Sequence, residues 1–534
     1  MRPRILALIL TLAAVLLPPA VLQGEKFANP ILEGADPWVV HHEGTYYLVQ
    51  SERQVGVSLR MSDCLTRWGD RQVIWRAPAE GMYSREVWAP KIYFIDGRWY
   101  IYTAASDGQN KNHLMWVFQS ESDDPLGPYV NKGALYTGDH IETQEHNRWA
   151  IDGNTFVHEG ERYFVWSGWP GTEDVQFLYI ARMSNPWTIA TNRVKLCHNA
   201  DYLWERVAES PDERGLHEGP QMLQRDGRLL LIYSASASWL PTYKLGMLEL
   251  AAGGDPMNPD DWFKHPEPVF QSTEETFGVG HNCFTTSPDG SEDWIVYHAK
   301  VDRAPGWRRM IFAQPFRWTD DGLPDFGRPV AAGELLPLPS GQPQRPRKQA
   351  LEESFAGARL GSRWGYYGHH RLMAVRDGRL HLGRSEARDP AYIFRTGEKV
   401  VHHDFAADDV EVRTRLRFVA GQRDAGVLFR VQYPAVGYDA QHGYYAGLVL
   451  GTDLLVLGKT DGTNWQELVR AHTPLGLDQD YELAVRAEGP RIQVSLDGKM
   501  LIEHDDATYR RGSVGVRVVD THAAFDRITA RSLD

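Results

Sequence analysis

The sequence has few cysteines, few long apolar runs and no excess of basic residues, and each of these features excludes a class of protein. It contains only 3 cysteines in 534 residues, so a disulfide framework is not expected to stabilise the fold. No long apolar run follows residue 24, so we expect no membrane span in the rest of the chain. Basic residues are outnumbered by acidic ones, 57 to 70, and the net charge of −13 argues against a nucleic-acid partner. A neutral or cationic ligand suits this charge better.

The first residues indicate export, and the length indicates more than one domain. Residues 1–24 begin with Arg2 and Arg4, continue through an apolar run and break at Pro18 and Pro19, which is the order of a signal peptide. After its removal we expect a secreted or periplasmic protein. A chain of 534 residues exceeds one ordinary hydrophobic core, so two or more domains are expected.

Five similar segments follow one another in the first part of the chain. Each joins two apolar or aromatic stretches through a tight turn that contains glycine, which is the pattern of a β-hairpin. Successive turns lie about 50 to 70 residues apart, and such an interval contains roughly four strands, as one propeller blade does. The repeats therefore predict a five-bladed β-propeller over residues 25–335. The turn glycines are Gly44, Gly97, Gly160, Gly227 and Gly290.

Acidic residues stand at equivalent places in three of these repeats. Asp36 and Asp152 lie eight residues before their turn glycines, and Glu218 lies one residue farther from its own. In a propeller the innermost strands line a central channel, so equivalent positions of different blades converge. Each acid taken singly is explained better as a turn, capping or surface residue. Their joint placement predicts three carboxylates around one cavity.

Such a group of carboxylates suits the hydrolysis of a glycosidic bond. One carboxyl must be protonated to donate to the leaving oxygen, and another must be ionised to activate water or attack carbon. A third carboxylate raises the pKa of the acid by like-charge repulsion and fixes its orientation. No cofactor is required, because water and the acids supply the chemistry.

Five ordered motifs carry a resemblance to a known family. Residues 27–335 contain GADPWV, VWAPKI, AIDGNTF, HEGPQML and GVGHNCF, and this series resembles glycoside hydrolase family 43, the five-bladed propeller hydrolases of arabinans and xylans. The resemblance implies Asp36 as general base, Glu218 as general acid, and Asp152 as the residue that tunes the pKa of the acid and orients it. It also implies inversion at the anomeric carbon, with the base and acid carboxyls on the order of 6.5 to 9.5 Å apart.

The same resemblance suggests residues that bind the substrate. Trp88 matches an aromatic platform near the terminal sugar, with a core tryptophan as the equal alternative. His281 matches a histidine below the sugar, and a core histidine with satisfied hydrogen bonds is an at least equal alternative. In some relatives this histidine lies beside calcium or its waters, so a structural calcium is compatible, although no metal ligand is predicted. Arg308 or its neighbour Arg309 is expected to pair with the acids or with a sugar hydroxyl, with an exposed arginine pair as the alternative. Trp169 and Trp239 are expected to form subsite walls.

A second domain is expected after the repeats. Residues 336–349 are rich in Pro, Gln and basic residues without apolar periodicity, which predicts a linker. Residues 350–534 alternate apolar strands with glycine turns, which predicts an antiparallel β-sandwich, and they resemble the concanavalin-like, laminin-G-type jelly rolls. Such a domain either binds carbohydrate or packs on the propeller and borders its active site. The aromatic residues considered for carbohydrate binding are Trp364, Tyr366, Tyr444 and Tyr445.

The sequence thus predicts an all-β hydrolase of plant-type pentose polysaccharides, with a five-bladed β-propeller followed by an antiparallel β-sandwich. We expect an inverting α-L-arabinofuranosidase, and a β-D-xylosidase of the same family is the nearest alternative. Long insertions after the second and third repeats favour exo action, because they are long enough to close the channel at one end. A non-catalytic carbohydrate-binding propeller is the alternative of another class, but a lectin needs no acid and base pair. No feature of the sequence indicates an oligomeric state.

Overall fold

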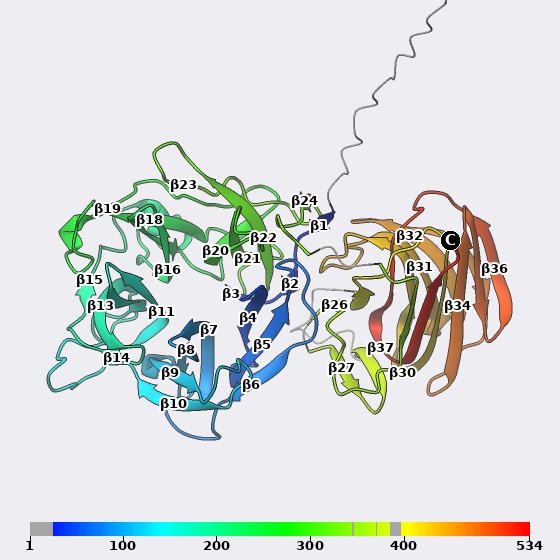
Figure 1. The fold of residues 1–534 in the computed structure, drawn as a ribbon, viewed down its shortest axis with the longest axis horizontal. Helices are drawn as coiled ribbons and strands as arrows, with labels where there is room; N and C mark the ends of the chain where they lie inside the picture. Colours follow the sequence, from blue (N-terminus) through cyan, green and yellow to red (C-terminus); the bar gives the residue numbers. More distant parts are fainter. Residues whose placement is uncertain (1–24, 344–346, 370, 385–396) are drawn as a thin grey trace, which may run out of the picture.

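The computed structural model describes residues 25–343, 347–369, 371–384 and 397–534, so the expected signal peptide lies outside the described residues. The first part of the chain is the five-bladed β-propeller predicted from the repeats (Figure 1). Each blade is an antiparallel sheet, and strands β3, β7, β11, β16 and β20 lie nearest the centre of the ring.

The blades follow the order of the chain. Blade one consists of β3 (Trp38–His42), β4 (Thr45–Ser51), β5 (Gly56–Ser62) and β6 (Gln72–Arg76). Blade two consists of β7 (Arg85–Ile95), β8 (Arg98–Ser106), β9 (Leu114–Ser120) and β10 (Tyr129–Ala134). Blade three consists of β11 (Ala150–His158), β12 (Glu161–Gly168), β13 (Phe177–Asn185), β14 (Thr188–Ile189) and β15 (Val194–Lys195). Blade four consists of β16 (His217–Arg225), β17 (Arg228–Ala235), β18 (Lys244–Leu250) and β19 (Trp262–Lys264). Blade five consists of β20 (Phe277–Thr286), β21 (Asp293–Lys300), β22 (Arg309–Trp318), β23 (Pro324–Asp325) and β2 (Leu32–Glu33).

The start of the chain closes the ring. Strand β2 pairs with β22 and becomes an outer strand of blade five, and β1 (Lys26–Ala28) pairs with β24 (Leu335–Pro337). The two ends of the propeller are therefore held together by sheet hydrogen bonds, so the ring cannot open without breaking a sheet.

Acidic-Gly turns connect the first two strands of the first four blades. In Glu43 and Gly44, for example, φ is 48° and 74°, and Asp96 and Gly97 repeat the pattern with 50° and 76°. Two successive positive φ angles define the type I′ turn, whose twist matches that of the paired strands. Glycine at the second position avoids the steric cost that a side chain would bring there.

The inner strands of the five blades share an unusual backbone conformation at or near the predicted site residues. Asp36, Ala89, Asp152, Gly219 and His281 all have φ between 40° and 60°. The pairing register shifts around four of these residues, in β7, β11, β16 and β20. A β-bulge of this kind bends a strand and re-aims its side chains. The bulges thus interrupt the alternation of the inner strands at the level of the central cavity.

The second part of the chain is the predicted antiparallel sandwich. Its long strands β30 (Val410–Gln432) and β37 (Ser513–Ser532) pair with each other and with strands on both sides, and its apolar side chains form one core. The other strands are β25 (Ala350–Glu353), β26 (Trp364–Tyr367), β27 (Met373–Arg376), β28 (Arg379–Gly383), β29 (Lys399–His402), β31 (His442–Val449), β32 (Leu454–Asp461), β33 (Trp465–His472), β34 (Asp480–Glu488), β35 (Arg491–Leu496) and β36 (Lys499–Asp505).

Helical segments in the described ranges are short. The 3₁₀ turns are η1 (Asn110–Asn112), η2 (Leu203–Glu205), η3 (Val207–Glu209), η4 (Pro259–Asp261) and η6 (Leu450–Thr452). None of the helices in these ranges has the length and apolar composition that crossing a membrane requires.

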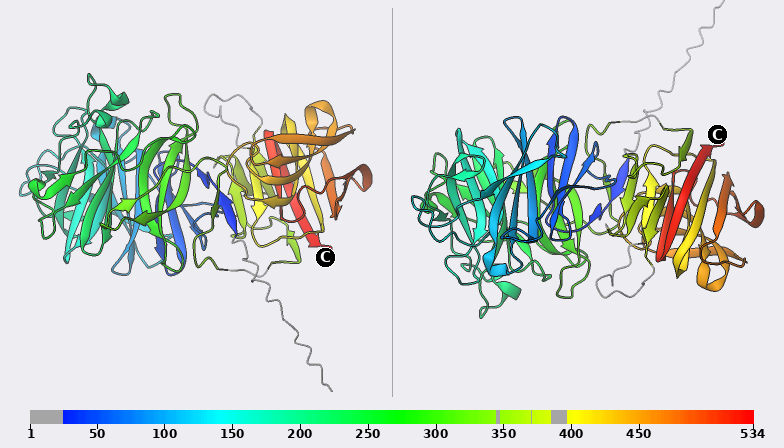
Figure 2. Two further views of the ribbon diagram at one scale, coloured as in Figure 1. Left: turned by 90° about the horizontal axis from the view of Figure 1, so that it is seen from above. Right: turned by 90° about the horizontal axis from the view of Figure 1, so that it is seen from below.

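The propeller and the sandwich share an apolar core. Figure 2 shows the two parts side by side, with the blue strands from the start of the chain near their junction. Met310 and Val330 belong to the same buried cluster as Leu428 and Val436 of the sandwich, and the Val436 N–H donates to the Pro30 carbonyl at 3.0 Å. The sandwich is therefore packed on the propeller by a continuous hydrophobic contact.

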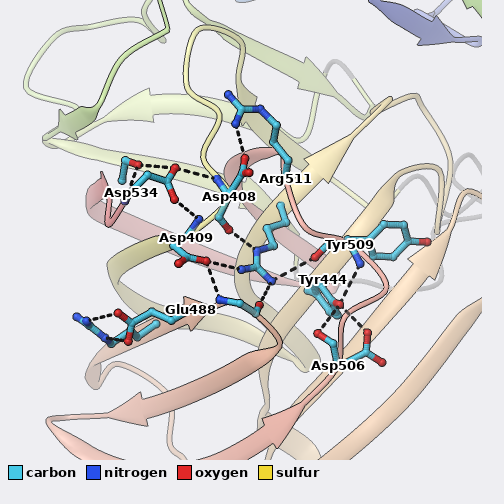
Figure 3. Close-up of polar contacts among 12 residues, drawn as sticks. Asp408, Asp409, Tyr444, Glu488, Asp506, Tyr509, Arg511 and Asp534 are labelled. Carbon is cyan, nitrogen blue, oxygen red and sulfur yellow. Dashed lines mark hydrogen bonds and ion pairs between the residues drawn. The ribbon is translucent and has the colours of Figure 1, made fainter. Parts of the chain in front are cut away.

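The aromatic residues considered for carbohydrate binding in the sandwich are buried. The hydroxyl of Tyr444 donates to Asp506 Oδ1 at 2.6 Å and accepts from the Tyr509 N–H at 3.1 Å (Figure 3). A ring enclosed in this way cannot stack on a sugar, so the prediction that these residues form a carbohydrate surface is wrong. The exposed fractions are 2% for Trp364, 1% for Tyr366, 0% for Tyr444 and 2% for Tyr445.

Candidate active site

All five blades contribute to one cavity of about 1020 Å³. Each blade provides at least one of Asp36, Trp88, Asp152, Glu218 and His281 to its lining. Trp88, Asp152, Glu218 and His281 lie at or beside the bulges of the inner strands, and Asp36 lies just before β3. The sandwich contributes to the cavity as well, through the segment after β26, and its lining residues are His369 and Arg371.

Asp36 is held as a carboxylate by three cationic or hydrogen-bonding groups. Arg309 Nη1 donates to its Oδ1 at 3.2 Å, and the Nδ1 atoms of His298 and His281 lie 3.2 and 3.4 Å from the same oxygen. Burial would raise the pKa of Asp36, but Arg309, His281 and His298 outweigh it and hold that pKa well below its usual range. Asp36 is therefore ionised at neutral pH, as a general base must be.

The surroundings of Glu218 favour the protonated carboxyl, in contrast to those of Asp36. The residue is 8% exposed, Gln176 Nε2 donates to Oε2 at 3.5 Å, and Oε1 has no hydrogen-bond partner among the described residues. Burial raises the pKa of Glu218, and the carboxylate of Asp36 raises it further, while the Tyr243 and Ser238 hydroxyls act in the other direction. A carboxyl with a raised pKa and a free oxygen can carry a proton to a leaving group.

Asp152 links the inner strands of blades three and four. Its Oδ2 accepts from the Gly219 N–H at 2.9 Å, next to Glu218, and its carbonyl accepts from Lys91 Nζ at 2.8 Å. Burial raises the pKa of Asp152; His281 lowers it, and the carboxyl of Glu218 raises it. Asp152 thus fixes the backbone that presents Glu218 and is electrostatically coupled to it.

Trp88 and Trp169 occupy different positions. Trp88 lines the cavity, and its indole stacks on the buried His113 with ring centroids 3.9 Å apart. Trp169 is 5% exposed and is not a lining residue. It stacks on Trp149 at 4.5 Å, and Trp149 is the ring of this pair that reaches the cavity.

The neighbouring residues Arg308 and Arg309 have different partners. Arg308 lines the cavity and pairs with Asp302, whereas Arg309 reaches Asp36. Arg308 immediately precedes β22 and Arg309 begins it, and the two side chains contact different acids. Of the two candidates in the GWRRM motif, Arg309 therefore contacts the candidate base.

A directly ligated calcium ion does not fit the donors near His281. Its Nε2 is buried without a partner among the described residues, so one imidazole nitrogen is available. However, no three His, Cys, Asp or Glu side chains of the described ranges are arranged to hold a metal ion. Calcium prefers six to eight oxygen ligands, which this group of side chains does not supply.

Several residues of the site were not predicted from the sequence. His298 lies near the end of β21, the second strand of the fifth hairpin, where the other repeats have small polar residues. This departure was the signal that could have identified it. Lys91, Gln176 and Tyr243 had no comparable signal, because they reach the acids only through the packing of neighbouring blades.

Comparisons with known proteins identify the family of this chain and several relatives. The model of the family "Glycosyl hydrolases family 43" matches residues 27–324. The chain is 36% identical over 318 residues to "Alpha-L-arabinofuranosidase 43" of Humicola insolens, which is 57% of this chain and 63% of that protein. It is 36% identical over 284 residues to "Extracellular exo-alpha-(1->5)-L-arabinofuranosidase" of Streptomyces chartreusis, covering 51% of this chain and 82% of that protein. This chain therefore spans less than two thirds of the Humicola protein but most of the Streptomyces one.

A solved structure supports the same relationship. The α-L-arabinofuranosidase from Lactobacillus brevis aligns with a TM-score of 0.52 and 33% sequence identity, over 57% of this chain and 98% of that chain. Both the sequence and the structural similarity thus include the propeller.

Proposed function

Because the chain belongs to glycosyl hydrolase family 43, we propose that it is an exported, inverting α-L-arabinofuranosidase that releases terminal arabinofuranosyl groups from arabinan- or arabinoxylan-type chains. The observation that carries the proposal is that the surroundings of two carboxyls in one cavity shift their pKa values in opposite directions. Arg309 and two histidines keep Asp36 ionised, and burial favours the protonated form of Glu218. The relatives named as arabinofuranosidases support the choice of sugar.

The proposed chemistry follows from these opposite pKa shifts. Glu218 donates its proton to the glycosidic oxygen as the bond to the anomeric carbon breaks. Asp36 accepts a proton from a water molecule that attacks the same carbon from the opposite face, so the product has inverted configuration. Asp152, bound to the Gly219 N–H, keeps Glu218 in position. A second proton transfer is needed before the next turnover, from Asp36 to Glu218 through solvent.

The substrate is tested with paired aryl glycosides. We expect the wild type to hydrolyse the aryl α-L-arabinofuranoside faster than the aryl β-D-xyloside, and Asp36→Asn to lose activity on both. Glu218→Gln should lose roughly 10²- to 10⁴-fold on a natural linkage but much less on an aryl glycoside, whose leaving group needs little protonation. Asp174→Asn is the matched control. Asp174 also lines the cavity, but it pairs with Arg214 and has no role in the proposed reaction.

The outcomes separate the alternatives. Preference for the xyloside would keep the mechanism and change the substrate to that of a β-D-xylosidase. Binding of sugar without hydrolysis of either glycoside would favour the non-catalytic propeller. An equal loss by Glu218→Gln on good and poor leaving groups would show that Glu218 is not the acid.

A further inference from the structure

We propose that the indole of Trp307 binds the sugar on the leaving-group side of the scissile bond and so makes the enzyme prefer pentose chains to small leaving groups. The inference deepens the proposed function and rests on it. Trp307 lies in the segment between β21 and β22, lines the catalytic cavity and is 63% exposed. Tryptophan is usually among the more deeply buried residues, so an indole this open at a cavity is suited to contact a ligand.

The ring has neighbours that hold it in place. Its centroid lies 5.4 Å from that of Trp239, which also lines the cavity, and the Arg309 guanidinium lies 5.3 Å from it. The backbone beside it is anchored as well, since the Gly306 N–H donates to the Trp239 carbonyl at 2.8 Å and Lys300 Nζ donates to the Gly306 carbonyl at 2.6 Å. A ring that is positioned before binding loses less entropy when the ligand arrives.

The position of the pair matches the leaving-group side. Trp239 directly follows Ser238, whose hydroxyl acts on the carboxyl of Glu218, the proposed acid. The sugar that receives the proton from Glu218 must lie beside this carboxyl. Trp88 lies in blade two, against His113, and so offers a separate surface for the sugar whose bond is broken.

The chemistry of an indole suits this ligand. The C–H face of a pyranose or furanose ring is apolar, and it packs on an aromatic face while its hydroxyls stay in water. The neighbouring Arg309 is already paired with Asp36, so the open part of the indole is the available contact. The expected ligand is therefore a neutral pentose residue of the polysaccharide chain.

Binding to a catalytically blocked protein tests the proposal directly. In the Glu218→Gln background, Trp307→Ala should raise the Kd of arabinotriose measured by calorimetry by about threefold to tenfold, and it should raise the Kd of arabinose by less than twofold. Trp307→Phe should recover part of the affinity for arabinotriose. Phe263→Ala is the control, because Phe263 is 59% exposed on β19 and does not line the cavity.

Kinetics of the active protein give a second test. Trp307→Ala should lower kcat/KM for arabinotriose about threefold to tenfold more than it lowers kcat/KM for arabinofuranosyl fluoride, whose leaving group is too small to reach the indole. Equal losses on the two substrates, or no loss on arabinotriose, would overturn the inference while the proposed function stands. If the wild type cleaves neither substrate, the proposed function itself fails.

Discussion

At the scale of single residues, Arg309 controls the proton state of the candidate base. Its guanidinium lowers the pKa of Asp36 and also that of Glu218. Arg309→Met should therefore raise both pKa values. Because the base must be ionised and the acid protonated, the acidic and basic limbs of the kcat/KM profile should both move to higher pH. A pH–rate profile of the variant measures this shift.

The neighbouring arginine is the matched control for this experiment. Arg308→Met removes a guanidinium of the same segment that pairs with Asp302. We expect it to change KM but to leave the limbs of the profile in place. An Arg309→Met profile with both limbs unmoved would mean that Arg309 does not set the charge of Asp36.

The residues that the sequence could predict are those that the repeat itself marks. Asp36, Asp152, Glu218 and His281 stand at or beside equivalent positions of four blades, and the structure brings them to one cavity. The repeat does not mark residues that act across blades. His298 reaches Asp36 from the second strand of blade five, and its role depends on a contact 262 residues away in the sequence.

At the scale of the elements, the bulge of β16 is the feature that links backbone conformation to catalysis. Gly219 has φ of 55°, and a Cβ added there would lie 3.2 Å from His281 Cγ and Ser234 Oγ. Gly219→Ala should therefore cost about 1 to 3 kcal/mol of stability. It should also reduce kcat, because the same residue donates to Asp152. Denaturant unfolding and kinetics measure the two effects.

Gly160→Ala is the control that separates the effect of backbone strain from the effect of crowding by neighbouring atoms. Gly160 has φ of 85° but no atom within 4 Å of an added Cβ. Gly160→Ala should cost stability through the same backbone strain and leave kcat unchanged. If Gly219→Ala also kept the full kcat, the conformation of this bulge would have no part in placing Glu218.

The strands and turns could be predicted from the sequence where neighbouring residues determine them. Acidic-Gly turns between apolar stretches predict the hairpins, and five of them predict five blades. The bulge in blade five departs from this regularity. The positive φ falls on His281 and not on Asn282, although Asn282 lies eight residues before its turn glycine Gly290, as Asp36 and Asp152 do before theirs. The assignment of β2 to blade five depends on pairing with Ile311 and Met310, and no local pattern encodes such a distant contact.

At the scale of the whole molecule, the shared core should make the propeller and the sandwich unfold together. Leu428 is fully buried in the cluster that also contains Met310 and Val330. We expect one calorimetric transition for the wild type, with loss of activity at the same temperature. Leu428→Ala should remove about 2 to 5 kcal/mol and separate the two parts into two transitions. Two transitions already in the wild type would contradict this coupling.

A buried carboxyl makes this coupling depend on pH. Glu398 is 5% exposed, and its carboxyl accepts from the Tyr366 hydroxyl and, at 2.8 Å, from the N–H of His369. His369 lines the cavity, and its Nε2 lies 3.6 Å from Oε1 of Glu33 in β2. Burial raises the pKa of Glu398 to about 8. Between pH of about 4.5 and 8 the unfolded chain loses this proton while the folded protein keeps it.

Stability should therefore be highest below this window and fall as the pH rises through it, by up to about 1.4 kcal/mol per pH unit from this group. Glu398→Gln resembles the protonated form and can still accept from Tyr366 and His369. The variant should match the wild type at pH 5 and exceed its Tm at pH 8, as measured by circular dichroism over the series. Parallel Tm curves for the two proteins would show that Glu398 is ionised in the folded state. The segment that carries His369 into the cavity would then depend on a buried carboxylate and not on a neutral acid.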